Sequence, residues 1–123
     1  MTTPWGTSQS KTVFERGLFI VTTMSHGGLM VSKTKATKLF STSALVHAIS
    51  YGNYYCFEED CAISVAIEDS EVVLGYIAHR LGRTKEDLLA LAVRSNRVFY
   101  PLYRQSALIR YDKNGLPKNV NCI

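Results

Sequence analysis

The feature that most constrains this chain is a pair of strand-like segments joined by a short, glycine-containing reversal. Residues 17–23 are rich in β-branched and aromatic side chains, and residues 29–31 resume that character. Gly27 and Gly28, placed between them, can adopt the positive φ angles that a tight reversal demands. The pattern predicts an antiparallel strand pair that holds His26 at the rim of a sheet.

Composition predicts a single domain that covers residues 1–123. A chain of 123 residues buries roughly two thirds of its unfolded surface, which is enough for one hydrophobic core. Hydrophobic residues make up 46% of the chain and charged residues 20%, a balance that argues against disorder. The amino terminus lacks the basic start and apolar core of a signal peptide, and no apolar run is long enough to cross a bilayer. We therefore expect a cytoplasmic protein without a membrane partner.

Cysteine usage agrees with that location. The three cysteines are Cys56, Cys61 and Cys122, an odd number without the spacing of a zinc finger. We expect reduced thiols and no disulfide framework.

Short helices and one buried strand are predicted after the first strand pair. Residues 33–40 favour a short helix, and a second helix, capped by the serines and threonine of residues 41–43, ends at Gly52. Residues 54–57 are aromatic and apolar, as in a buried strand. Asp60, which follows this strand, is expected to cap the next helix.

Residues 71–95 carry the clearest helical periodicity and predict a helical hairpin. Gly82 breaks the pattern, and Thr84 is a suitable N-cap for the second helix. The spacing is similar to that of a DNA-reading helix-turn-helix. Two acids, Glu86 and Asp87, begin the helix that would enter the major groove, where they would meet phosphates. An ordinary helical hairpin is therefore favoured over a DNA reader.

The last third of the chain returns to β character. Residues 97–101 and 106–111 are typical of short strands, and residues 112–115 contain a good turn sequence. The predicted fold class is thus α+β: a small antiparallel sheet with three to five short helices, including the hairpin near 71–95, and a C-terminal β-hairpin.

Positive charge is concentrated at the carboxyl end of a chain whose net charge is +4. Residues 88–123 hold six basic residues and one acid. Arginines interleaved with tyrosines are typical of protein interfaces, although a solvated face with the tyrosines in the core fits the same pattern. The residues expected to contact a partner are Arg94, Arg97, Tyr100, Tyr103, Arg104 and Arg110, with Lys33 and Lys35 from a second basic group.

One group of polar residues is expected to converge at the sheet. His26 lies at the predicted reversal, and Glu58, Glu59 and Asp60 follow the buried strand. A histidine with one or two carboxylates is the minimum for acid–base catalysis or a metal site. No nucleophile, phosphate-binding or dinucleotide motif accompanies it. A structural hydrogen-bonded network is therefore favoured, and we expect no catalytic residue, metal or cofactor.

Three short motifs in series resemble an uncharacterised domain family found mainly in bacteriophage and prophage proteins. They are Trp5-Gly6, then His26-Gly27-Gly28, then Glu58-Glu59-Asp60-Cys61, and the resemblance covers residues 4 to about 67. It implies a phage or mobile-element origin and carries no assigned activity.

This context suggests an accessory protein that inhibits a host defence system, of the anti-CRISPR or anti-restriction type. It would act by stoichiometric binding to a host protein, such as a nucleic-acid-binding effector complex, in the cytoplasm of the infected bacterium. Two alternatives stay open: a helix-turn-helix DNA-binding regulator and a small metal-dependent enzyme. Weak, sequence-independent nucleic-acid binding and a homodimer are compatible with the basic charge and the expected edge strands.

Overall fold

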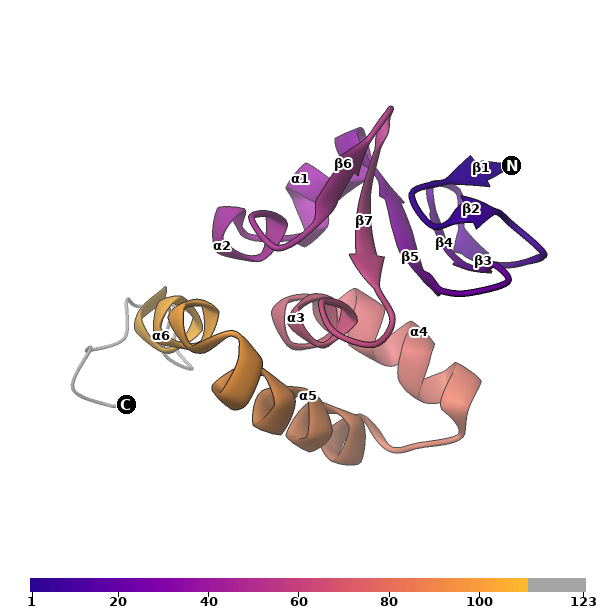
Figure 1. Ribbon diagram of the computed structural model, residues 1–123. Coiled ribbons are helices and arrows are strands. Elements are labelled where there is room, and N and C mark those ends of the chain that lie inside the picture. Colours follow the sequence, from indigo (N-terminus) through magenta and orange to yellow (C-terminus); the bar gives the residue numbers. More distant parts are fainter. Residues whose placement is uncertain (111–123) are drawn as a thin grey trace.

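A five-stranded antiparallel sheet with helices packed on one face forms the centre of the molecule (Figure 1). The computed structural model describes residues 1–110, with side chains as far as Ala107. The strands, in the sheet order β3-β4-β5-β7-β6, are β3 (Ser10–Glu15), β4 (Leu18–Thr22), β5 (Gly27–Ser32), β7 (Tyr54–Glu58) and β6 (Ile49–Tyr51). A separate small hairpin is made by β1 (Thr2–Thr3) and β2 (Gly6–Thr7).

Six helices lie in the described part of the chain. They are α1 (Lys33–Leu39), α2 (Thr42–Leu45), α3 (Ile63–Asp69), α4 (Glu71–Leu81), α5 (Lys85–Phe99) and α6 (Pro101–Arg110). Helix α3 lies between the sheet and α5, and α6 continues from the end of α5 (Figure 1). The α+β class is confirmed. None of the helices within residues 1–110 has the length and apolar character needed to cross a membrane.

The strands alternate between two apolar faces, as a period of two residues requires. One face packs against the helices, and its fully buried side chains are Leu18, Leu29, Val31 and Phe57. The opposite face carries Phe19, Val21, Met30 and Cys56. Trp5, at the tip of the β1–β2 hairpin, packs against this second face.

The β4–β5 hairpin is confirmed, but Gly27 and Gly28 serve it differently from the prediction. Both lie inside β5 without positive φ angles. A Cβ on Gly28 would lie 2.2 Å from the carbonyl oxygen of Phe57 and 2.6 Å from the Trp5 ring, and one on Gly27 would lie 2.5 Å from the carbonyl oxygen of Val21. These glycines are therefore needed for close approach of backbones and not for the reversal itself.

The helical hairpin is also confirmed. Gly82 adopts the left-handed conformation, with a φ of 66°, and Thr84 accepts a hydrogen bond from the Asp87 amide at 3.1 Å as an N-cap. Two leucines predicted for its buried stripe are instead exposed: Leu81 by 54% and Leu91 by 40%.

The predicted C-terminal β-hairpin is wrong where the structure describes it. Residues 97–99 form the last turn of α5, and residues 101–110 form α6. Pro101 is the first residue of its helix, a position that needs no amide hydrogen. Leu88, Ala92 and Asn96, spaced four apart, bury one face of α5, and this packing outweighs the local strand preference. Tyr111 and the predicted turn at residues 112–115 lie outside the described residues.

Two local predictions near the sheet also differ. Gly52, expected to end a helix, makes the β6–β7 turn with a φ of 55°. Asp60 does not cap α3, because that helix begins at Ile63 and its N-cap is Ala62, without a side-chain hydrogen bond.

Candidate functional site

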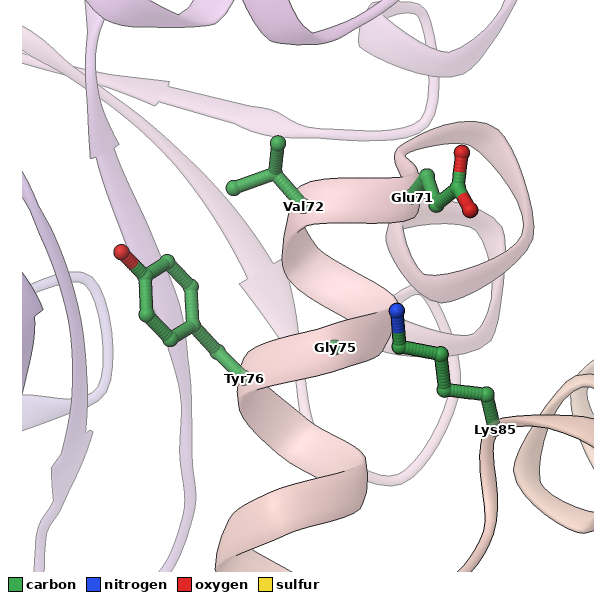
Figure 2. Close-up of a pocket in the computed structure, with 5 residues that line it drawn as sticks. All are labelled: Glu71, Val72, Gly75, Tyr76 and Lys85. Atoms are coloured by element: carbon green, nitrogen blue, oxygen red, sulfur yellow. The ribbon is translucent and has the colours of Figure 1, made fainter.

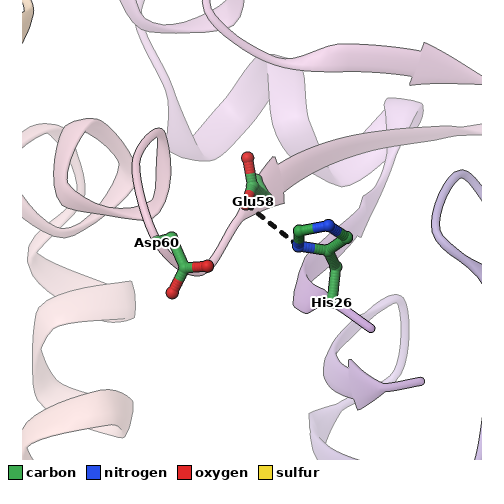
Figure 3. A group of neighbouring side chains, drawn as sticks. All are labelled: His26, Glu58 and Asp60. Carbon is green, nitrogen blue, oxygen red and sulfur yellow. Dashed lines mark ion pairs between the residues drawn. The ribbon is translucent and has the colours of Figure 1, made fainter. Parts of the chain in front are cut away.

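His26, Glu58 and Asp60, which we call the His26 cluster, come together at one end of the sheet (Figure 3). His26 Nδ1 lies 3.6 Å from Glu58 Oε1. One nitrogen or oxygen atom from each of the three side chains lies within 4.8 Å of the others. The predicted proximity of His26 to the acidic run is therefore confirmed, while Glu59 is exposed and lies outside this group.

Backbone hydrogen bonds hold both segments of the His26 cluster. The Thr23 amide donates to the His26 carbonyl at 2.7 Å, and the Thr23 hydroxyl accepts from the His26 amide at 3.1 Å. Glu58 is the register partner of Gly28 in the β5–β7 pairing, which the Glu59 amide extends by donating to the Gly27 carbonyl at 3.0 Å. The cluster thus stands on the reversal after β4 and the turn after β7.

The side chains of the His26 cluster are open to solvent. The His26 side chain is 51% exposed and that of Glu58 is 29% exposed, and Asp60 is exposed as well. The 3.6 Å ion pair is longer than a hydrogen bond. Among the described residues the Asp60 carboxylate has no hydrogen-bond partner. The partly buried, hydrogen-bonded network that the sequence favoured is therefore not the arrangement found.

Tyr100 lies on the helical side of the cluster. Its half-buried position, and then the neighbouring Cys61 and Glu58 side chains, raise the pKa of the Tyr100 hydroxyl. The His47 ring packs edge-on to Tyr100 at 4.8 Å between centroids. Cys61 is an exposed free thiol, whereas burial raises the pKa of Cys56 to about 11.

Two of the predicted partner contacts are buried in a polar network between helices. Tyr103 is 1% exposed and donates to Asp69 Oδ1 at 3.0 Å. Arg104 forms an ion pair with Glu68, where the two side chains are 15% and 7% exposed, and burial lowers the pKa of the guanidinium. Neither residue presents a surface for a partner. Tyr103 therefore follows the alternative prediction, in which the tyrosines lie in the core.

Asn96 is the centre of this network and was not singled out by the sequence. It is fully buried, and its amide group donates to the Ser64 carbonyl at 3.0 Å and to Glu68 Oε1 at 2.9 Å. The Ser64 hydroxyl donates to Asn96 Oδ1 at 2.6 Å. The available signal was its position four residues after Ala92 on the buried stripe of α5.

Arg94 and Arg97 remain exposed on α5, as expected for partner contacts. Neither forms an ion pair with another described residue, and Tyr100 is only half-buried beside them. The side chain of Arg110 lies outside the described part.

An apolar surface next to these arginines was missed by the sequence analysis. Val98, Phe99 and Leu102, which we call the elbow because they lie where α5 passes into α6, are 69%, 68% and 76% exposed. The surface was missed because residues 97–101 were predicted to form a strand and not the junction of two helices.

Lys33 and Lys35 are both engaged within the chain. Lys35 Nζ donates to Glu15 Oε1 at 2.5 Å, and Lys33 Nζ lies 5.3 Å from the centre of the Tyr55 ring. Lys35 lines a basic cavity of about 460 Å³, together with Arg16, Gly17, Ser32, Thr34, Lys38 and Tyr54. The Glu15 carboxylate neutralises part of that charge.

An open cavity of about 410 Å³ lies on the outer face of α4 (Figure 2). Its lining residues are Glu71, Val72, Gly75, Tyr76 and Lys85. The Tyr76 hydroxyl is already used, because it donates to Glu15 Oε2 at 2.5 Å. The cavity therefore offers few convergent polar groups and is a weaker candidate than the His26 cluster or the elbow.

No curated protein and no solved structure matches the chain significantly. A family model described as a domain of unknown function, DUF7007, matches residues 1–101. The match extends through the helical hairpin, well beyond the residues that carried the resemblance seen in the sequence. On this match, the chain belongs to the DUF7007 family of domains.

Proposed function

We propose that this chain is a stoichiometric protein-binding factor and that the elbow is the centre of its binding surface. The observation that carries the proposal is the exposure of Val98, Phe99 and Leu102, each by more than two thirds, within five consecutive residues. Large apolar side chains gathered on a surface mark interaction sites, and aromatic residues are favoured at the centre of interfaces. Phe99 is therefore the expected anchor.

Charge on the neighbouring turns of α5 indicates the kind of partner. Arg94 and Arg97 are exposed, and no described residue pairs with them. Arg94 and Val98 are four residues apart on one helix and share a face with Arg97. An acidic protein surface with an apolar centre is the complementary partner, because the arginines would pair at the rim while the elbow is buried.

The proposed biological role is inhibition of a bacterial defence system by a phage- or mobile-element-encoded protein. The resemblance of the sequence motifs to phage and prophage proteins supports this role. Nucleic-acid-binding effectors of CRISPR and restriction systems are the target class. The inhibitor would block the effector or hold it inactive by binding, without a catalytic step of its own.

DNA binding by the α4–α5 hairpin is the less favoured function. Gly82, in the left-handed conformation, separates the two helices, and the spacing of the hairpin is similar to that of such a motif. Its second helix, however, begins with exposed Glu86 and Asp87, which would lie against phosphates. Any nucleic-acid binding should therefore be weak, independent of sequence and lost at moderate salt.

The proposal is tested by phage plating on bacteria that carry an active CRISPR or restriction system. Expression of the chain should raise plating of a targeted phage, and the double variant Phe99→Asp/Leu102→Asp should abolish the effect. Val13→Asp is the matched control, because Val13 is 56% exposed on β3, away from the elbow. No rise with any system in a broad panel would overturn the defence role, and undiminished activity of the double variant would exclude the elbow.

A further inference from the structure

We propose that His26, Glu58 and Asp60 form a binding site for one divalent transition-metal ion. This site is separate from the elbow and does not depend on the function proposed above. One imidazole nitrogen and two carboxylate oxygens are donors that Zn²⁺ and Mn²⁺ accept together. Three protein ligands leave coordination positions for water.

The spacing of the donor atoms fits such an ion after a small contraction. The donor atoms lie within 4.8 Å of one another. Two ligands bound to the same Zn²⁺ ion lie about 3.3 Å apart, since each metal bond is about 2.0 Å and the geometry is tetrahedral. Exposed side chains can close that difference by rotation, without a change in the backbone. Figure 3 shows the three side chains gathered around a common space.

The backbone holds the two ligand-bearing segments in fixed relation. His26 is fixed by its hydrogen bonds to Thr23, and Glu58 is fixed by its pairing with Gly28. The amide of Cys61 donates to the Glu58 carbonyl at 3.3 Å and closes the turn that carries Asp60. Gly27 and Gly28 permit this closeness, because a Cβ on either would strike a neighbouring strand. Prior ordering of the ligands lowers the entropic cost of binding the ion.

The site gathers more acidic side chains than basic ones. Glu58 and Asp60 place two carboxylates beside one half-exposed imidazole. Asp60 neither caps α3 nor accepts a hydrogen bond from another described residue. Helix capping and hydrogen bonding, which often explain an aspartate after a strand, therefore do not explain Asp60 among the described residues. A divalent ion would offset the repulsion and tie the reversal after β4 to the turn after β7.

Calorimetric titration of Zn²⁺ into the full chain tests the site. One equivalent should bind. His26→Ala and Asp60→Asn should each weaken binding by about ten-fold or more, as loss of a ligand does at least as much as loss of a supporting residue. The Glu59→Gln variant is the matched control, because Glu59 adjoins the ligands in sequence but is not among them, and it should bind like wild type. Cys61→Ser should also leave binding unchanged, which separates this site from a thiol site.

Two further measurements keep the test independent of folding. In EDTA the His26→Ala and Asp60→Asn variants should melt at the wild-type temperature, because both residues are exposed. Added Zn²⁺ should raise the melting temperature of wild type, Glu59→Gln and Cys61→Ser more than that of these two ligand variants. Mn²⁺ should broaden the amide NMR signals of residues 26 and 58–60 before all others. Absence of binding, binding retained by a His26→Ala/Asp60→Asn double variant, binding lost with Cys61→Ser, or broadening centred elsewhere would each overturn the site.

Discussion

Arg97 and Arg104 are both basic residues of the C-terminal helices, yet they have opposite surroundings. Arg97 is exposed, whereas the guanidinium of Arg104 lies in an ion pair with the nearly buried Glu68. The position of α6 decides this difference, because it brings Arg104 to Glu68 of α3. From the sequence, both arginines were predicted to contact a partner. Only the packing of α6 distinguishes them.

Replacement of Arg104 should therefore affect stability and not partner binding. Arg104→Ala leaves the Glu68 carboxylate buried without its cation, and we expect a loss of about 3 kcal/mol in the free energy of unfolding. Arg97→Ala should change it by less than about 0.5 kcal/mol. Urea denaturation of both variants makes the comparison, and equal effects would contradict the buried ion pair.

Glu15 joins three elements at the edge of the sheet. The Lys35 ammonium, followed by the Tyr76 hydroxyl, forms hydrogen bonds to this carboxylate and lowers the pKa of Glu15 below its ordinary value of 4.5. A carboxyl group whose pKa is lowered on folding stabilises the native state above the unfolded pKa, and this contribution is lost as the pH falls through the folded pKa.

The stability difference between wild type and Glu15→Gln should consequently depend on pH. It should be largest near neutral pH and should shrink as the pH falls below about 4.5. Lys35→Met should reduce the same acid-dependent difference, because it removes the first cause of the pKa shift. Thermal melts from pH 7 to pH 3 measure this effect, and a constant difference over that range would show that the pair contributes no charge-dependent stability.

At the level of elements, glycines decide how closely the strands approach. Gly28 contacts both the backbone of β7 and the ring of Trp5, so β5 can lie between two apolar layers. The sequence indicated a hairpin at this point but assigned the glycines to its turn. A pattern of residue types does not distinguish a glycine needed for positive φ from one needed for space.

Gly28→Ala and Gly75→Ala should therefore have opposite effects. The added methyl group at position 28 meets the Phe57 carbonyl, and the resulting overpacking should cost about 2 kcal/mol or more. Gly75 lies within α4, where the nearest atom to a new Cβ is the flexible Lys85 side chain at 3.5 Å. That change should stabilise the helix by up to about 1 kcal/mol. Chemical denaturation compares the two, and stabilisation by Gly28→Ala would contradict the packing described.

The sequence predicted those elements whose local pattern agrees with their packing. The β4–β5 hairpin, β7 and the α4–α5 hairpin have strong periodicity together with suitable turns or caps. Residues 97–99 were misassigned because Val98 and Phe99 prefer strands locally, while the buried stripe that ends at Asn96 keeps them in α5. The His26 cluster was predictable, since strand ends carry its side chains. The elbow was not, because its exposure follows from the course of α6.

At the scale of the whole molecule, two separate surfaces carry exposed side chains that packing of the fold does not require. The His26 cluster stands at the end of β7, and the elbow lies at the junction of α5 and α6. The family match covers the whole His26 cluster and two of the three elbow residues, because it ends at residue 101. We therefore expect that a variant of the His26 cluster can lose metal binding without losing protein binding, and that a variant of the elbow can do the reverse.

The most direct measurement is calorimetric titration of the chain into a purified defence effector that it inhibits in the plating assay. Wild type and Val13→Asp should bind with equal affinity at a fixed stoichiometry. Phe99→Asp should weaken binding by about thirty-fold or more, the equivalent of a 2 kcal/mol interface anchor. Equal affinity of Phe99→Asp and wild type, or loss of binding in Val13→Asp alone, would contradict the assignment of the elbow as the binding surface.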